Sequence, residues 1–301
     1  MIKEPMLSAK LPTMQELLDA MPYPMLASRK IDGIRAICSN HEGIVRLYSR
    51  KLKLIPNRST QVDLAQSVLV GLDGELVVGN SWGEGVFART TSGVMSMNGD
   101  PSAVWHVFDD WTHTDHPFSQ RYERVCRIVD NLFQMRVVTV SQTNVRNAAE
   151  AEAYHAESLK LGYEGSMFRR GDAPYKEGRA TVRSGWLFKC KEWDDAEAVV
   201  VDVEELMHNA NEAQTNELGR TKRSSHQANM VPMGTLGAFV CRTEDGRVFN
   251  VGGGPGLTSA MRQHFWNVRD SLIGRTAKYR FLRVGVVELP RHPLFLGFRE
   301  D

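Results

Sequence analysis

Cysteine is scarce in this chain of 301 residues, and the four that occur lie far apart. Cys38, Cys126, Cys190 and Cys241 form no C-x-x-C pair, which argues against a zinc site and predicts free, buried thiols. The sequence also lacks a run of about 18 apolar residues, the length that crosses a membrane as a helix. Its first residues do not resemble a signal peptide. We therefore expect a cytoplasmic protein that does not contact a membrane.

An excess of charge of one sign is also missing, since 37 Lys and Arg face 36 Asp and Glu. A balanced total neither supports nor excludes nucleic-acid binding, because binding depends on clustering of positive charge. We found no internal repeat and no low-complexity segment. The hydrophobic content of 42% and the length predict a soluble globular protein with one large domain and a smaller one.

The most informative stretch is residues 28–35, which read Ser-Arg-Lys-Ile-Asp-Gly-Ile-Arg. This pattern presents Lys30 on a tight Asp-Gly turn. A lysine attacks phosphorus only as a neutral amine, and its ordinary pKa is about 10.4. Partial burial and positive neighbours, here Arg29 and Arg35, favour the neutral form, and a metal ion held by carboxylates would act more strongly. Taken alone, the stretch is also compatible with an exposed, charged turn.

Further short patterns follow in order along the chain. They are Tyr48-Ser49-Arg50, Asp73-Gly74-Glu75-Leu76, Val107-Phe108-Asp109-Asp110, Glu164-Gly165-Ser166-Met167, Phe188-Lys189-Cys190-Lys191 and the segment from Arg291 to Arg299. Together with K-x-D-G-x-R they resemble the signatures of the covalent nucleotidyltransferases, which include ATP-dependent DNA ligases, RNA ligases and mRNA capping enzymes. The last segment resembles the closing signature of small DNA ligases of phage and large-virus type. The resemblance covers nearly the whole chain, and its specificity comes from the order of the patterns.

The resemblance implies an α+β protein of two domains. Residues 1–193 would form a nucleotidyltransferase (adenylation) domain with antiparallel sheets and flanking helices, and residues 194–301 an all-β OB-fold domain. The segment before Lys30 is too short for a separate DNA-binding domain, so we expect a minimal enzyme.

Periodicity and turn residues predict individual elements. Helices are expected after a Thr13 N-cap and at residues 63–70, 88–96, 118–133, 147–161 and 258–271, and strands at residues 163–170, 186–191, 198–206 and 275–287 with hairpins at 33–48 and 234–251.

The resemblance gives the signature residues their roles. Lys30 would attack the α-phosphorus of ATP and form lysyl-AMP. Glu75 and Arg35 would bind the ribose hydroxyls, since a carboxylate accepts from O–H groups and a guanidinium donates to oxygens. Arg29 would join the nucleotide site. Arg50 would bind a phosphate, including the 5′-phosphate of a DNA nick.

Carboxylates and aromatics complete the expected site. Glu164, together with Glu75, would hold Mg²⁺ or Mn²⁺, because one or two protein acids suffice for such an ion. Phe108 would stack on adenine, and an ordinary core position is the alternative. For Asp109 and Asp110 the choice between a second acid near the metal and a turn residue stays open.

Basic residues near the ends of the two domains would contact phosphates. Lys189 and Lys191 share one face of a strand and would stabilise charge on the α-phosphate, with a solvated strand edge as the alternative. Arg291, with Arg299, would orient the pyrophosphate leaving group. The loop of residues 207–233 would contact DNA through Arg220, Lys222 and Arg223, with a polar disordered loop as the alternative.

We therefore interpret the sequence as an ATP-dependent DNA ligase that seals nicked or cohesive-ended duplex DNA, acting as a monomer in a bacterial or phage-infected cell. The alternatives are a capping guanylyltransferase, which uses GTP, and a non-catalytic module that binds DNA nicks. The closing signature favours a ligase over a capping enzyme. The intact set of Lys30, Glu75, Glu164 and the two lysines argues against a pure binding module.

Overall fold

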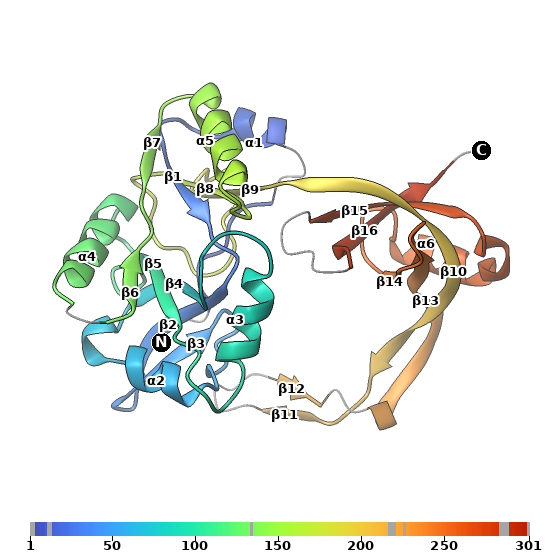
Figure 1. Ribbon diagram of the computed structural model, residues 1–301, viewed down its shortest axis with the longest axis horizontal. Coiled ribbons are helices and arrows are strands. Elements are labelled where there is room, and N and C mark those ends of the chain that lie inside the picture. The colour runs from blue at the N-terminus through green and yellow to red at the C-terminus, as the bar shows by residue number, and fades with distance from the viewer. Residues whose placement is uncertain are drawn as a thin grey trace. The chain divides into compact units, whose positions relative to one another are not determined.

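A computed structural model describes residues 4–10, 14–132, 135–215, 221–224, 227–282 and 289–299. The chain forms two compact units, Met1–Glu192 and Trp193–Asp301 (Figure 1). Thr13, the predicted helix cap, and Arg220 lie outside the described residues. Within the described ranges, no helix is long and apolar enough to span a membrane.

Two β-sheets form the frame of the first unit. The larger has the order β3-β2-β4-β5-β6, and only its β5–β6 pair is parallel. Its strands are β2 (Ile34–His41), β3 (Ile44–Ser49), β4 (Leu72–Val77), β5 (Val104–Asp110) and β6 (Val137–Thr139). The smaller sheet is antiparallel and has the order β7-β1-β8-β9. Its strands are β1 (Met25–Lys30), β7 (Thr143–Val145), β8 (Gly165–Arg169) and β9 (Leu187–Lys191).

Helices flank these sheets, and a separate apolar cluster lies under each sheet. The helices are α1 (Met14–Ala20), α2 (Arg58–Leu64), α3 (Val86–Val94), α4 (Phe118–Asp130) and α5 (Ala148–Lys160), with a 3₁₀ turn η1 (Ser67–Leu69). α4 packs on β5 and β6, and α5 packs on β1 and β8. Trp105, fully buried, is in the larger cluster, and Phe168 and Phe188 are in the other.

Capping residues decide where two of these helices begin. Asn147 accepts a hydrogen bond from the Glu150 backbone N at 2.9 Å and starts α5 one residue later, which confirms the predicted helix there. The helix expected at residues 63–70 is wrong in position. Asn57 caps α2 by accepting from the Thr60 backbone N at 2.8 Å, so the helix begins at Arg58 and residues 67–69 form only a 3₁₀ turn.

The second unit is a five-stranded sheet with the order β14-β13-β10-β15-β16. Its strands are β10 (Trp193–Asn209), β13 (Met230–Arg242), β14 (Val248–Val251), β15 (Thr276–Leu282) and β16 (Arg291–Phe298). A bridge between Gly253 and Leu294 joins the ends of the sheet, which closes it into a barrel. α6 (Ser259–Asn267) covers it, with 3₁₀ turns η2 (Gln227–Asn229) and η3 (Arg269–Leu272). β11 (Ala213–Thr215) pairs with β12 (Thr221–Arg223).

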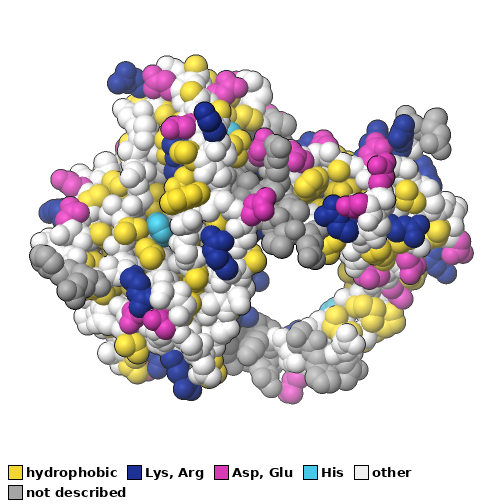
Figure 2. All heavy atoms as spheres, viewed as in Figure 1, with side chains coloured by type: hydrophobic (Ala, Val, Ile, Leu, Met, Phe, Trp, Pro, Cys, Tyr) yellow, Lys and Arg dark blue, Asp and Glu magenta, His cyan; other side chains and the backbone are white. Residues whose placement is uncertain are grey.

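The α+β prediction of a mixed domain followed by a barrel is confirmed. β10 is much longer than the predicted strand at 198–206, because it pairs with β15 at its start and with β13 from Val199 onwards. On the visible faces, positive and negative side chains are interspersed (Figure 2), in keeping with the balanced net charge. All four cysteines are free, and Cys126 alone among them is only half-buried.

Candidate active site

A cavity of about 210 Å³ in the first unit is lined by both sheets and by residues 6–8. Eight of the residues predicted from the sequence line it: Arg29, Lys30, Arg35, Arg50, Glu75, Phe108, Lys189 and Lys191. They come from β1, β2, β4, β5, β9 and the turn after β3. The fold thus brings residues more than 150 positions apart into one site.

Lys30 ends β1, where its carbonyl accepts a hydrogen bond from the Glu164 backbone N at 3.2 Å. The side chains also meet, because Lys30 Nζ donates to Glu164 Oε2 and Lys191 Nζ donates to Glu164 Oε1. The Glu164 side chain is 2% exposed. Burial raises the pKa of Glu164, but the two ammonium groups outweigh burial and hold the pKa at about 2. Glu164 is therefore ionised and shared between two lysines.

This arrangement sets the protonation state of Lys30. Burial lowers the pKa of Lys30, whereas Glu164 and then Glu75 raise it, and the net result is a raised pKa. The expectation that Arg29 and Arg35 favour a neutral amine is wrong for this state of the protein. Arg29 pairs with Glu157 at 3.0 Å, and Arg35 pairs with an aspartate. Lys30 remains an ammonium as long as its carboxylate partner holds it.

The two lysines of β9 differ from Lys30 in their electrostatics. Burial lowers the pKa of Lys189, the charges of Lys191 and Lys30 lower it further, and the pKa is about 8. The pKa of Lys191 is also lowered, by burial and then by the charge of Lys30. Both side chains line the cavity and do not lie on a solvated strand edge. An anion in the cavity would therefore meet a cluster of three amines.

Glu75 is the acidic residue among those that line the cavity. Burial raises its pKa, Lys30 and Arg35 lower it, Glu164 and Asp32 raise it, and the pKa is about 7. Within the described ranges, no three His, Cys, Asp or Glu side chains form a group that could hold a metal. Mg²⁺, however, needs only one or two carboxylates and keeps several waters. Glu164 and Glu75 fit such an ion, because added positive charge would offset the burial and the smaller repulsion from Glu164 that raise the pKa of Glu75.

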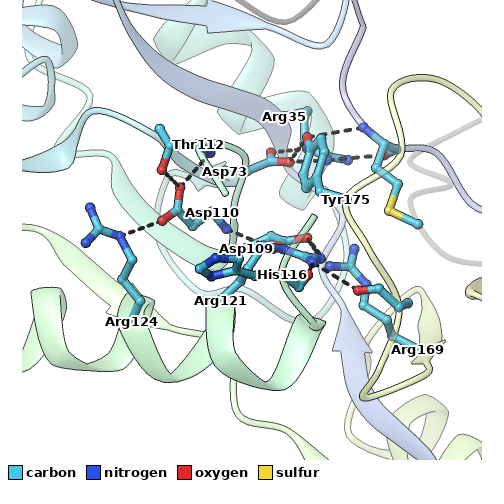
Figure 3. Close-up of polar contacts among 12 residues, drawn as sticks. Arg35, Asp73, Asp109, Asp110, Thr112, His116, Arg121, Arg124, Arg169 and Tyr175 are labelled. Atoms are coloured by element: carbon cyan, nitrogen blue, oxygen red, sulfur yellow. Dashed lines mark hydrogen bonds and ion pairs between the residues drawn. The ribbon is translucent and has the colours of Figure 1, made fainter. Parts of the chain in front are cut away.

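A closed set of hydrogen bonds fixes Arg35 in the cavity wall (Figure 3). Its Nε and Nη2 donate to the two oxygens of Asp73, both at 2.5 Å, and Nη2 also donates to the Met6 carbonyl at 3.3 Å. Tyr175 Oη donates to Asp73 at 2.7 Å and accepts from Met6 N at 3.2 Å. The Arg35 guanidinium lies 4.8 Å from the ring centroid of Phe108. The ring is half-buried, packs on a small apolar cluster and borders the cavity, so part of it is open to a ligand.

Asp109 and Asp110 have structural partners. Asp109 is fully buried and accepts from Arg121 Nε at 2.8 Å and from Arg169. Asp110 accepts from Arg124 Nε at 2.6 Å (Figure 3). Asp110 also accepts from the Thr112 backbone N at 2.8 Å, which makes it a turn residue at the end of β5, whereas Asp109 anchors arginines. Neither carboxylate is among the residues that line the cavity.

Four residues of the site escaped the sequence argument: Asp73, Arg169, Tyr175 and Arg179. Asp73 could have been found, because residues two apart on a strand share a face and Glu75 had already been chosen. Arg169 and Arg179 line the cavity, and Tyr175 contacts it through Asp73. Arg169 and Arg179 come from segments whose many arginines gave no ground to prefer one, and Tyr175 had no signature to mark it.

Behind the smaller sheet, a chain of buried polar side chains crosses three strands. The Cys190 Sγ lies 3.3 Å from His155 Nε2, and His155 Nδ1 lies 3.2 Å from Ser166 Oγ. Ser166 donates to Ser158 Oγ at 2.9 Å, which also accepts from Arg29 at 2.6 Å. This chain ties β1, β8 and β9 to α5, and the lysines of the cavity lie on β1 and β9.

The remaining predicted residues belong to the second unit. Arg291 begins β16, and Arg299 lies just after it, with Nη1 3.2 Å from Glu197 Oε2. Arg223 is exposed on β12 and donates to the Asn211 carbonyl. Lys222 lies on the same strand, although its side chain is outside the described residues. Their roles at the nucleotide and on DNA stay predictions.

Comparison with known proteins shows which family this chain resembles. A sequence model of the ATP dependent DNA ligase domain matches residues 5–191, and one of the DNA ligase OB-like domain matches residues 229–299. A DNA ligase of African swine fever virus is 30% identical over 192 residues, which cover 59% of this chain and 44% of the relative. A probable DNA ligase of Streptomyces griseus is 29% identical over 218 residues, 67% of this chain and 42% of the relative. The chain spans less than half the length of these two relatives.

Solved structures agree over the whole length. The crystal structure of Chlorella virus DNA ligase-adenylate is 26% identical, with a TM-score of 0.55 over 99% of this chain and 100% of that chain. A structure of Lig E DNA ligases, described as binding DNA with a minimal scaffold, is 23% identical and shares the fold with a TM-score of 0.71 over 99% of this chain and 100% of that one. On the family match, which covers most of the chain, this protein belongs to the ATP-dependent DNA ligase family.

Proposed function

We propose that this chain is an ATP-dependent DNA ligase that joins a 5′-phosphate to a 3′-hydroxyl in duplex DNA. The observation that carries the proposal is the contact of Lys30 and Lys191 with one buried carboxylate, Glu164, beside a cavity that Arg35 and Glu75 also line. A lysine with only a surface role would not need a buried carboxylate and a cavity beside it. A lysine nucleophile that attacks a polyphosphate needs both, because the carboxylate holds the amine and the cavity holds the phosphates.

Lys30 would act in the first step. Its Nζ leaves Glu164, loses a proton and attacks the α-phosphorus of ATP, so that a P–N bond forms as the bond to the leaving oxygen breaks and pyrophosphate departs. Lys189 and Lys191 donate to the α-phosphate oxygens as negative charge develops. A Mg²⁺ or Mn²⁺ ion at Glu164 and Glu75 would supply positive charge that offsets the phosphates and favours the neutral amine.

The nucleoside would occupy the side of the cavity formed by the larger sheet. Phe108 stacks on adenine with the open part of its ring, while Arg35 lies 4.8 Å from the ring centroid. Glu75 accepts from the ribose hydroxyls, and it does so most strongly when its carboxylate is ionised, because both oxygens then accept and carry charge. Arg29 borders the same cavity.

DNA would enter after AMP is attached. The 5′-phosphate of a nick or cohesive end attacks the AMP phosphorus and releases Lys30, and the 3′-hydroxyl then displaces AMP. Arg50 is exposed and lines the cavity, which suits it to bind the 5′-phosphate. Arg220, Lys222 and Arg223 would bind backbone phosphates, and Arg291 would orient pyrophosphate in the first step. We propose that the protein acts as a monomer in the cytoplasm.

Label transfer tests the proposal directly. The protein is mixed with Mg²⁺ and either α-labelled ATP or α-labelled GTP, alongside Lys30→Ala, and resolved on a denaturing gel. We expect label from ATP only, lost in Lys30→Ala and retained in Lys160→Ala, which removes an exposed lysine of α5. Label from GTP alone would indicate a capping enzyme. Label from neither would contradict an enzyme of this kind and leave a binding module.

A further inference from the structure

The connection between β4 and α3, residues 78–85, is exposed in part but firmly held. Arg89 of α3 donates to three backbone carbonyls of this stretch: Val78 at 2.8 Å, Asn80 at 2.8 Å and Glu84 at 2.9 Å. A guanidinium presents its donors in a rigid planar fork, so three such bonds restrict the loop to one conformation. The loop is therefore preorganised without a ligand.

The tip of this loop docks onto the C-terminal end of α5. Gly83 N donates to the Gly162 carbonyl at 2.9 Å. Gly162 has φ of +84°, and a Cβ there would stand 3.1 Å from Gly83 N and 3.9 Å from the Cβ of Trp82. A side chain at this position would strain the backbone and press on the loop. The close approach thus depends on glycine and sets the position of Trp82.

Trp82 contacts the residue that precedes Glu164 of the candidate active site. Its ring centroid lies 6.3 Å from that of Tyr163, with the planes tilted by 51°. Tyr163 directly precedes Glu164, the partner of Lys30, and the Arg29 guanidinium lies 5.9 Å from the Tyr163 centroid. Tyr163 also packs on a small apolar cluster that includes Ile31. Through Tyr163 the Trp82 indole is thus connected to Arg29 and Ile31, the residues on either side of Lys30 in the sequence.

Despite this anchoring, the Trp82 side chain is 48% exposed. Bending the loop inward could bury the indole, but the bonds from Arg89 and to Gly162 hold it out. Tyr163 links the indole to positive charge, because the Arg29 guanidinium lies 5.9 Å from the Tyr163 centroid, and Arg29 lines the cavity together with Lys30 and Lys191. A flat apolar ring beside positive charge is complementary to a nucleic acid, which offers bases to the ring and phosphates to the cations. A protein partner would require a wider apolar patch.

We propose that Trp82 is a stacking platform for a base or sugar of the DNA substrate next to the end that reacts. This inference rests on the proposed ligase function and extends it, because none of the signature residues includes Trp82. Stacking on an aromatic ring accepts any base, so the contact would add affinity near the break without adding sequence preference. It would act after lysine adenylation, when DNA binds.

The test separates nucleotide chemistry from DNA binding. The full-length protein, Trp82→Ala and Trp82→Phe are first labelled with α-labelled ATP in the absence of DNA. Each is then titrated with a nicked duplex that carries a 5′-phosphate, and the dissociation constant is measured by fluorescence anisotropy. We expect adenylation within twofold of wild type for all variants, and binding about 5- to 100-fold weaker for Trp82→Ala. Trp82→Phe should retain most of the affinity because it keeps an aromatic face.

Two controls make the outcome specific. Val62→Ala removes an exposed apolar side chain on α2, 72% exposed, and should leave binding unchanged. The salt dependence of binding should have the same slope for Trp82→Ala and wild type, because counterion release reports phosphate contacts and not stacking. A reduced slope, or normal binding by Trp82→Ala, would overturn the proposal.

Failure of the proposed function gives a different result. If wild type takes no label, the ligase assignment fails. Unlabelled protein titrated with the same duplex still decides whether Trp82 contacts DNA. If Trp82→Ala binds DNA as wild type does but no longer retains a protein that wild type retains in a pull-down, the indole contacts a protein partner. That result would overturn the stacking platform.

Discussion

Two groups of buried carboxylates lie a few strands apart in the first unit, and they are held in different ways. Asp73 and Asp109 are fully buried and bind arginines, with Arg121 also fully buried. Glu164 is nearly as buried but binds two lysines whose side chains are 21% and 17% exposed. The pair of Asp109 with Arg121 is closed to solvent on both sides. Arg35 is 16% exposed, but two hydrogen bonds hold it to both oxygens of Asp73. The Glu164 pairs are open on the side of the amines, and each amine is held by one oxygen.

The difference follows from the chemistry of the two cations. Arginine is charged at any physiological pH and matches a carboxylate with two parallel bonds, which suits a permanent contact. Lysine is a point charge that can lose its proton or exchange its partner. The arginine pairs would therefore maintain the shape of the cavity, while the lysine pairs would change during the reaction. Substitutions in the two groups should separate stability from catalysis.

The largest effect on stability is expected for Asp109→Ala. It leaves Arg121 and Arg169 in the interior without their carboxylate, and breaking a buried pair in this way costs about 3–5 kcal/mol. Urea denaturation measures the change. Asp172→Ala is the matched control, because that ion pair is on the surface, 64% exposed on the aspartate, and should cost less than about 1 kcal/mol. Equal losses for both variants would refute the division into two groups.

Glu164→Gln should affect catalysis more than stability, which is the opposite of Asp109→Ala. We expect lysine adenylation to slow by about 10²- to 10³-fold, as for removal of one group that stabilises charge in a transition state, with a smaller loss of stability than Asp109→Ala. Because Glu164 raises the pKa of Lys30, the residual rate should reach half its maximum at a lower pH than in wild type. Single-turnover labelling across pH measures both. An unchanged pH profile would show that Glu164 does not control the amine.

The smallest effect is the pH dependence carried by Glu75, whose pKa is raised to about 7. Below this pH the folded protein holds a proton that the unfolded chain, with a pKa near 4.5, releases. The folded state therefore loses stability as pH rises from about 4.5 to 7. Glu75→Gln should be about 1–3 kcal/mol more stable than wild type at pH 8, with little difference at pH 4.5.

The same substitution should weaken ATP binding, since the amide has one acceptor oxygen and no negative charge, whereas the ionised carboxylate offers two charged oxygens to the ribose hydroxyls. In wild type, KM for ATP should rise as pH falls below about 7, and in Glu75→Gln it should be high at every pH. Thermal melts at pH 4.5 to 8 test the expected change in stability, and initial rates over the same range test the expected change in KM. A variant less stable than wild type at pH 8 would contradict the assigned pKa.

Much of the fold was accessible from sequence because local signals and signatures agreed. Asn147 and Gly162 mark the ends of α5, and the signature strands carry alternating patterns that fix which side chains face the cavity. The position of α2 was missed because Asn57 caps it through a single hydrogen bond, and the notion of a helix at residues 63–70 rested on composition alone. Long strands such as β10 cannot be read from one segment, since their length depends on two partners.

At the site, the sequence predicted which residues meet but not how their charges balance. Eight predicted residues line one cavity, yet the protonation state assigned to Lys30 was reversed. The signatures show Arg29 and Arg35 beside Lys30 in sequence, whereas in space both are taken by acids, Glu157 and Asp73. The residues adjacent to Lys30 in the sequence cannot predict these ion pairs, because the acidic partners lie far away in the sequence.

The segment from Glu4 to Lys10 has a consequence for how the site is made. Leu7 N donates to the Gly178 carbonyl, Ala180 N donates to the Leu7 carbonyl, and Ala9 N donates to the Leu187 carbonyl. Residues near the start of the unit thus complete the cavity wall only against residues near its end. During synthesis, a nascent chain that already contains Lys30 lacks this part of the wall until residue 187 has been added.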